Sequence, residues 1–127
     1  MFRTKGLANA ILTACEIAGK DKGTTAAVIA EKYELPPAYA AKIMGQLAKA
    51  NIFRSDRGPM GGYSLARPAN KITLLEIFEA VHGQLGDGSI HGLSGSLGKR
   101  VQGAVGSAND AIRDVLGNTT LAAIAKK

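Results

Sequence analysis

The side chains that could do chemistry in this chain are mostly basic or amide groups, and they gather between residues 36 and 63. Lys42, Gln46 and Lys49 recur at four- and three-residue spacing, which places them on one face of a helix. Arg57 follows in a glycine-rich stretch. Charged and amide side chains in this pattern suit contacts with the phosphates and base edges of a nucleic acid.

Catalytic and metal-binding patterns are weak by comparison. No Ser/His/Asp set and no carboxylate pair can be placed together, so we predict no enzyme. The single cysteine, Cys15, excludes an intrachain disulfide and a four-thiolate metal site, and we predict no metal site. Gly58, Gly61 and Gly62 do not form a nucleotide-binding loop, because no helix follows them as that chemistry requires.

The basic residues require a helix to position them. Pro36 and Pro37 suit the first turn of that helix. One face carries an apolar stripe, made of Tyr39, Ala40, Ile43, Met44 and Leu47. The other face is basic and smooth, made of Ala38, Ala41, Lys42, Gly45, Gln46 and Lys49. A helix with such a face can approach another surface closely.

A hairpin with a glycine-rich tip follows this helix. Residues 52–54 and 63–65 read as strands around the sequence Gly-Pro-Met-Gly-Gly. A helix joined to a basic hairpin is typical of a winged helix-turn-helix, in which the helix enters a major groove and the wing reaches the backbone or minor groove. Arg57 is then predicted to contact a phosphate or the minor groove.

Shorter helices are predicted around this unit. Thr4 is expected to cap a helix over residues 5–18, and Thr25 a short helix whose Val28, Ile29 and Ala30 face inward. Thr73 and Glu76 form a capping box for a fourth helix that Gly83 ends, with Ile72 and Ile77 at the hydrophobic staple positions.

The remaining chain changes character. Eight glycines fall between residues 83 and 106, and the first part of this stretch is predicted to be a mobile loop. A long helix with one apolar stripe follows despite its glycines, and such a stripe usually meets its own symmetry mate. The residues predicted to form a dimer contact are Leu97, Val101, Val105, Ala108, Ile112 and Leu116.

Charge is distributed unevenly along the 127 residues. Residues 1–71 hold eleven basic and five acidic residues, whereas the rest of the chain holds five of each. This asymmetry indicates a polyanionic partner for the first half, although a net charge of +6 also favours solubility alone. No apolar run is long enough to span a membrane, and we expect a cytoplasmic protein.

Residues 29–33, 39–53, 57–68 and 71–83 together resemble the Rrf family of bacterial transcription regulators, whose members include iron–sulfur, nitric-oxide and cysteine regulators. The resemblance covers about residues 2–83 and resumes weakly at 119–125. It implies a homodimer that binds a palindromic operator in double-stranded DNA. We predict that the protein represses a promoter by occlusion and that an effector alters the distance or angle between the two reading heads.

The predicted site residues follow from the resemblance and the helix pattern. Those predicted to contact DNA are Arg3, Lys5, Thr25, Pro36, Ala38, Tyr39, Ala41, Lys42, Gln46, Lys49, Arg57, Gly58, Pro59, Gly61, Gly62 and Tyr63. Tyr39 could equally belong to the core. Because Pro36, Ala38 and Ala41 replace polar residues of the family, thymine methyls and DNA shape are expected to matter more than bidentate hydrogen bonds.

The candidate sensor residues are Cys15, His91 and Ser96. Cys15 reads as a small core residue or as a redox switch. Family members that bind a cluster carry three cysteines in the loop before the dimer helix, and this loop has none, so no iron–sulfur cluster or other cofactor is predicted. Ser96 stands where another branch of the family keeps a single cysteine.

The predicted fold is mainly α with a small β-hairpin wing. It divides into a winged helix-turn-helix at 1–83, a glycine-rich loop at 84–96 and dimerisation helices at 97–127. The alternative function is a winged-helix module that has lost DNA reading and serves protein interaction or small-molecule sensing. The alanine-rich reading face favours the first of these and the glycine-rich loop the second.

Overall fold

The computed structural model describes residues 4–56 and 61–126. Seven helical segments and a two-stranded antiparallel sheet occur in these ranges, which confirms the predicted mainly helical fold with a hairpin. In chain order they are α1 (Thr4–Ala18), α2 (Ala26–Tyr33), α3 (Pro37–Lys49), β1 (Phe53–Asp56), β2 (Gly62–Leu65), the 3-10 helix η1 (Ala69–Lys71), α4 (Leu74–His82), α5 (Gly95–Asn118) and α6 (Leu121–Ala125).

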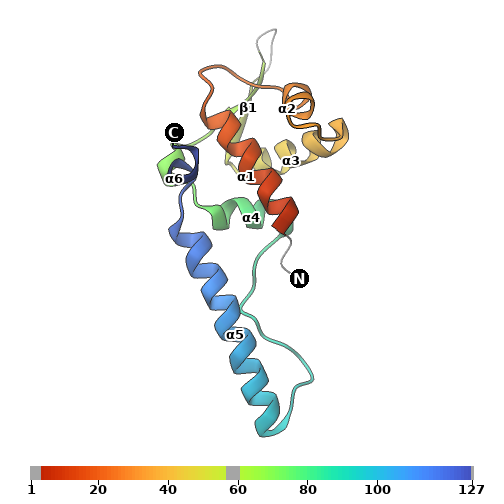
Figure 1. Cartoon of the computed structure of the whole chain (residues 1–127), viewed down its shortest axis with the longest axis vertical. Helices are drawn as coiled ribbons and strands as arrows, with labels where there is room; N and C mark the ends of the chain where they lie inside the picture. The colour runs from red at the N-terminus through yellow and green to blue at the C-terminus, as the bar shows by residue number, and fades with distance from the viewer. Residues whose placement is uncertain (1–3, 57–60, 127) are drawn as a thin grey trace.

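We call the part of the molecule made of α1–α4, the hairpin and α6 the head. The head is built around α1, and α5 projects away from it (Figure 1). Helix α1 packs against α4 and α6, while α2 packs on α3. Their contacts bury one continuous apolar core, in which the fully buried large side chains include Ile29, Met44, Leu47, Ile52, Phe53, Ile72, Ile77 and Leu121. Removal of this apolar surface from water is the main stabilising term of the head.

The two faces of α3 separate as predicted. Ala40, Ile43, Met44 and Leu47 are buried, and Tyr39 is half-buried at the edge of the core. The expectation for α2 was wrong at Val28, which is 51% exposed, whereas Ile29 and Ala30 are buried. A helix of eight residues presents only one narrow face to the core, and Val28 lies beside that face.

Helix ends follow the sequence closely. Thr73 accepts from the backbone N–H of Glu76, whose carboxylate accepts from Thr73 in return, and this confirms the capping box. Gly83 ends α4 with a φ of +86°. Thr4 was expected as a cap but is the first residue of α1.

The wing is held to the head by a third extended segment. β1 pairs with β2 from Phe53–Leu65 to Asp56–Gly62. Thr24 pairs with Tyr63 on the other side of β2, through Thr24 N–H to Tyr63 O at 2.9 Å and Tyr63 N–H to Thr24 O at 2.8 Å. Thr24, the residue before the N-cap of α2, therefore joins the wing to the helix-turn-helix.

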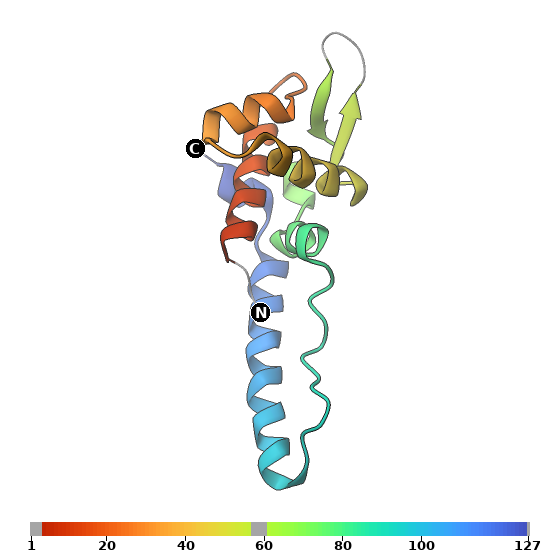
Figure 2. The same ribbon diagram turned by 90° about the vertical axis from the view of Figure 1, so that its right-hand side faces the viewer.

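Helix α5 and the preceding segment run side by side (Figure 2). The helix begins at Gly95, two residues earlier than predicted, so Gly95 and Ser96 belong to the helix and not to the loop. The φ of +74° at Gly95 favours glycine there, and Gly98 N–H already donates to Ser94 O at 3.2 Å.

Polar side chains of α5 hold the segment before it. Gln102 accepts from Ile90 N–H at 2.8 Å and donates to Gly88 O at 2.7 Å, and Asn109 donates to Gly86 O at 3.0 Å. The predicted loop is thus laid along the helix by defined hydrogen bonds. No helix within the described ranges is long and apolar enough to cross a membrane.

The last helix returns to the head. Thr120 pairs with Thr73, and α6 packs on α1 and η1, with Leu121 fully buried. The sequence-based prediction assigned residues 121–125 to the dimerisation helices. Leu121 of this segment instead packs in the core of the head.

Candidate nucleic-acid interface

The exposed face of α3 is the centre of the candidate site. Ala38, Ala41, Lys42, Gly45 and Lys49 are exposed, and Gln46 is half-buried. A Cβ atom added at Gly45 would have no neighbour within 4 Å, so the middle of this face is open. The face presents two ammonium groups and one amide above a surface of small residues.

A groove lies beside this face, between α1, the α2–α3 connection, α3 and the end of α4. Its volume is about 870 Å³. Lys5 of α1 lines it together with Pro36, Tyr39, Lys42 and Gln46, so the structure brings five of the predicted DNA-contacting residues around one hollow. The other lining residues are Thr4, Gly6, Asn9, Glu34, Leu35, Ile43, Val81 and His82.

Tyr39 has a defined structural contact inside this groove. Its hydroxyl accepts a hydrogen bond from the Asn9 side-chain amide at 3.2 Å, which links α3 to α1. The ring is packed at the edge of the core. Tyr39 therefore helps to set the angle between α1 and α3.

A second basic hollow surrounds the start of α2. Thr25 accepts from Val28 N–H at 3.3 Å, and Lys20 and Lys22 line a hollow of about 440 Å³ beside it. A helix N-terminus carries a partial positive charge. Thr25 therefore lies in a region of positive potential, although its side-chain oxygen already caps the helix.

A polar cluster joins α1 and α2. The Glu16 carboxylate accepts from the Tyr33 hydroxyl at 2.6 Å and from the Lys32 ammonium at 2.9 Å. The Tyr33 hydrogen bond, followed by that of Lys32, lowers the pKa of Glu16 to about 2. The same cluster raises the pKa of Tyr33 and of Lys32.

The wing residues divide into those that the structure describes and those that it does not. Arg57, Gly58 and Pro59 lie outside the described residues, as does Arg3. Gly61 and Tyr63 are half-buried, and the Tyr63 ring lies 6.1 Å from that of Phe53.

Gly62 allows a close backbone approach within the protein. A Cβ at Gly62 would lie 2.8 Å from the carbonyl carbon of Thr24. The glycine therefore permits the pairing of the wing with residue 24. No pattern in the sequence around Gly62 indicates that Thr24 lies against it. The contact of Gly62 with DNA stays a prediction.

Arg54 was not among the predicted contact residues. It is an exposed residue of β1 whose guanidinium pairs with Asp56 at 3.4 Å and donates to Ser64 at 3.3 Å. The signal in the sequence was an arginine in the predicted strand 52–54, shortly after the reading helix. Arg54 adds a cation to the same side of the hairpin as Asp56 and Ser64.

The predicted dimer stripe is exposed over the projecting half of α5. Leu97, Val101 and Val105 are 66%, 42% and 38% exposed. Ala108 is exposed too, whereas Ile112 is half-buried and Leu116 is buried against the head. The stripe thus has one end in the core of its own chain and one end facing solvent.

The candidate sensor residues lie apart from one another. Cys15 is half-buried against the core, and burial raises the pKa of its thiol. His91 is exposed in the segment before α5, and Ser96 is exposed in the first turn of α5. Nothing in the structure tests a sensing role for any of the three.

Metal-binding side chains do not converge in the described residues. No group of three or more His, Cys, Asp or Glu side chains there could hold a metal ion. In the segment before α5 the Asp87 carboxylate accepts from Ser89 N–H at 2.9 Å. Within residues 4–56 and 61–126 the donor side chains therefore do not come together in a way that fits an iron site.

The arrangement of three helices, a wing and a long projecting helix defines a winged helix-turn-helix fold. The Rrf2 family model, described as an iron-dependent transcriptional regulator, matches residues 4–127. The chain belongs to the Rrf2 family.

Individual relatives agree with this assignment. CymR, the global cysteine regulator of B. subtilis, is 26% identical with a TM-score of 0.80, covering 98% of this chain and 95% of CymR. The oxidised form of Staphylococcus aureus CymR is 29% identical with a TM-score of 0.79, covering 100% and 98%. The transcriptional regulator IscR of Cereibacter sphaeroides is 36% identical over 75 residues, or 55% of this chain and 48% of IscR. The chain spans less than half the length of the curated relatives it matches.

Proposed function

We propose that this protein is a homodimeric repressor that reads a palindromic operator in double-stranded DNA. The observation that carries the proposal is the exposed face of α3, where Lys42 and Lys49 flank the open surface at Gly45. This helix would lie in the major groove, with the wing and Arg57 on the adjacent backbone or minor groove. Lys5 and Thr25 would contact phosphates.

Dimerisation would use the solvent-facing half of α5. Leu97, Val101 and Val105 form an apolar stripe that remains 66%, 42% and 38% exposed among the described residues. A symmetric pair of such helices buries the stripe of each chain and places two α3 helices on one face. Half-sites about one helical turn apart would then be read together, and bound protein would occlude a promoter in the bacterial cytoplasm.

The experiment is binding of the full chain to DNA fragments from upstream of its own gene, followed by fluorescence anisotropy at several salt concentrations. We expect sequence-preferring binding that weakens with salt. Lys42→Ala and Arg57→Ala should each weaken binding and lower the salt slope by about one. Lys99→Ala, which removes an exposed lysine of α5, is the matched control.

Binding that is indifferent to sequence and to both variants would refute operator reading. The groove of about 870 Å³ then favours a second candidate, the sensing of a small molecule by a winged-helix module without DNA reading. Because Lys42 and Gln46 line the groove, a ligand there would occupy the same surface as DNA. A screen for thermal stabilisation by small organic anions would test this candidate.

A further inference from the structure

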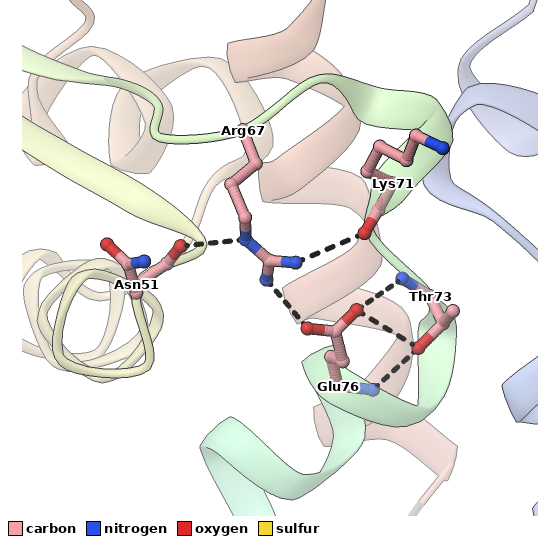
Figure 3. Close-up of polar contacts among 5 residues, drawn as sticks. All are labelled: Asn51, Arg67, Lys71, Thr73 and Glu76. Carbon is pink, nitrogen blue, oxygen red and sulfur yellow. Dashed lines mark hydrogen bonds and ion pairs between the residues drawn. The ribbon is translucent and has the colours of Figure 1, made fainter.

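Arg67 connects three separate elements at the base of the wing (Figure 3). It lies two residues after β2, and its guanidinium donates in three directions. Nε donates to Asn51 O at 3.2 Å, one terminal nitrogen donates to Lys71 O at 3.1 Å, and the other donates to the Glu76 carboxylate at 2.7 Å. The planar guanidinium suits this geometry, which an ammonium group cannot reproduce.

On one side, Arg67 holds the end of the reading helix. Asn51 follows α3 with a φ of +63°, and its N–H donates to Ala48 O at 3.0 Å. Ile52 N–H donates to Leu47 O at 3.0 Å before β1 begins. The contact with Asn51 O therefore fixes the turn through which α3 passes into the wing.

On the other side, Arg67 holds the start of α4. Its partner Glu76 also accepts from Thr73 N–H at 3.0 Å as part of the capping box. Burial would raise the pKa of Glu76, but the hydrogen bonds from Arg67 and Thr73 outweigh it and hold the pKa below its usual value. The Glu76 carboxylate is thus ionised in its ion pair with the Arg67 guanidinium.

The same segment joins the end of α5. Leu74 N–H donates to Thr119 O at 2.9 Å, and Leu121 N–H donates to Ile72 O at 2.8 Å. Residues 72–74 are therefore paired with residues 119–121, directly after the last turn of α5. Hydrogen bonds and the short backbone step from Thr73 to Leu74 thus link the turn after α3, through Arg67 and Glu76, to the residue after α5.

We propose that Arg67 is a positioning residue for DNA reading, which fixes the angle between α5 and the unit formed by α3 and the wing. In the homodimer this angle sets the separation of the two reading helices, so the inference rests on the proposed function. The Arg67 and Glu76 side chains are 29% and 39% exposed. An ion pair this exposed adds little to stability, so its removal should change geometry more than folding.

The first test measures the angle within one chain and without DNA. Spin labels are placed at Ser55→Cys in β1 and Ser107→Cys in α5, both exposed positions, in a Cys15→Ala background of the full chain. Labelled chains are diluted with unlabelled protein, so that pulsed electron paramagnetic resonance reports the distance within one chain. We expect Arg67→Gln to broaden the distance distribution and Arg67→Lys to restore only part of the wild-type width.

Two further variants sharpen this test. Lys71→Gln removes a neighbouring charge but leaves the Lys71 carbonyl that Arg67 uses, and it should leave the distribution unchanged. Glu76→Gln should broaden it, and the double variant with Arg67→Gln should broaden it no further. A distribution that Arg67→Gln leaves at wild-type width overturns the proposal.

The second test uses DNA selected from a random pool by the wild-type chain. The affinity for the selected palindrome is compared with that for a single half-site. Arg67→Gln should lose about tenfold on the palindrome and less than about twofold on the half-site, because it alters the relation between two heads rather than each head. Equal losses on both DNAs, in step with a lower melting temperature, would show a purely structural role and overturn the proposal.

The two tests distinguish a failure of the proposed role of Arg67 from a failure of the proposed DNA-binding function. If the wild-type chain selects no DNA, operator reading fails. The intrachain distance distribution still decides whether Arg67 fixes the angle.

Discussion

Gly62 lies so close to Thr24 that a Cβ atom at Gly62 would stand 2.8 Å from the Thr24 carbonyl carbon. Its φ is +139°, a region that residues with a Cβ rarely adopt. The close approach accompanies the pairing of Thr24 with Tyr63. The two-stranded wing is therefore joined by a single bridge to the residue two positions before α2.

Gly62→Ala should destabilise the protein by about 2 kcal/mol or more, because it combines backbone strain with a clash against fixed main-chain atoms. Chemical denaturation followed by circular dichroism measures this. Gly45→Ala is the control, since its Cβ would meet nothing and alanine should stabilise α3 by up to about 1 kcal/mol. An unchanged free energy of unfolding for Gly62→Ala would contradict the close approach.

Val101→Asp should dissociate the proposed dimer while leaving the head folded. Val101 is 42% exposed in one chain, so the carboxylate remains hydrated in the monomer but would be buried unpaired in a symmetric contact. We expect the dimer to weaken at least a hundredfold, from a cost of about 3 kcal/mol or more.

Sedimentation equilibrium measures the dimer dissociation constant. Ser107→Asp places the same charge on an exposed position of α5 away from the stripe and should leave the constant nearly unchanged. If both variants behave alike, the stripe is not the contact.

Acid should remove the contribution of Glu16 to stability. The pKa of Glu16 in the folded state is about 2, below its ordinary value of 4.5, because of hydrogen bonds from Tyr33 and Lys32. A lowered folded-state pKa stabilises the protein above the unfolded value, and this contribution is lost as pH falls through 4.5 towards 2. The excess melting temperature of wild type over Glu16→Gln should therefore shrink over this range.

Thermal melts at several pH values check this dependence. Glu31→Gln removes an exposed carboxylate from α2 and serves as the control for general charge effects. A wild-type advantage that stays constant down to about pH 3 would count against the cluster as described.

Cys15 should react slowly in the folded protein. Its thiol is half-buried against the core, and burial raises its pKa, so little thiolate exists near neutral pH. Alkylation by iodoacetamide, followed by mass spectrometry, should be about tenfold slower or more than for an exposed cysteine. Ser55→Cys in the Cys15→Ala background supplies that reference, and rapid alkylation of Cys15 would revive a redox role.

Local patterns predicted the elements of this fold well. The stripe of Ile43, Met44 and Leu47 and the reciprocal cap of Thr73 and Glu76 each depend on residues three or four positions apart. The chain itself enforces such relationships through helical geometry. Sequence reasoning therefore identified α3, α4 and α5 and the exposed face of α3.

Relationships across the fold were not predictable in this way. Thr24 and Tyr63 are far apart in the chain, and no sequence pattern around either residue predicts that they pair. The return of Leu121 to the core and the three-way contact of Arg67 likewise depend on how elements pack. Val28 was misplaced because hydrophobicity alone does not say which face of a short helix the core covers.

The packing of α5 against the head at one end has a mechanical consequence. The helix has 24 residues and packs on the head near Leu116 and Thr119, while its other end projects away from the head. At 1.5 Å per residue it is about 36 Å long, so a tilt of about 5° at its base displaces the far tip by about 3 Å. The helix is in this sense a lever: a slight rotation at Thr119 becomes a displacement of atomic size at Gly95, where the segment laid along α5 joins it.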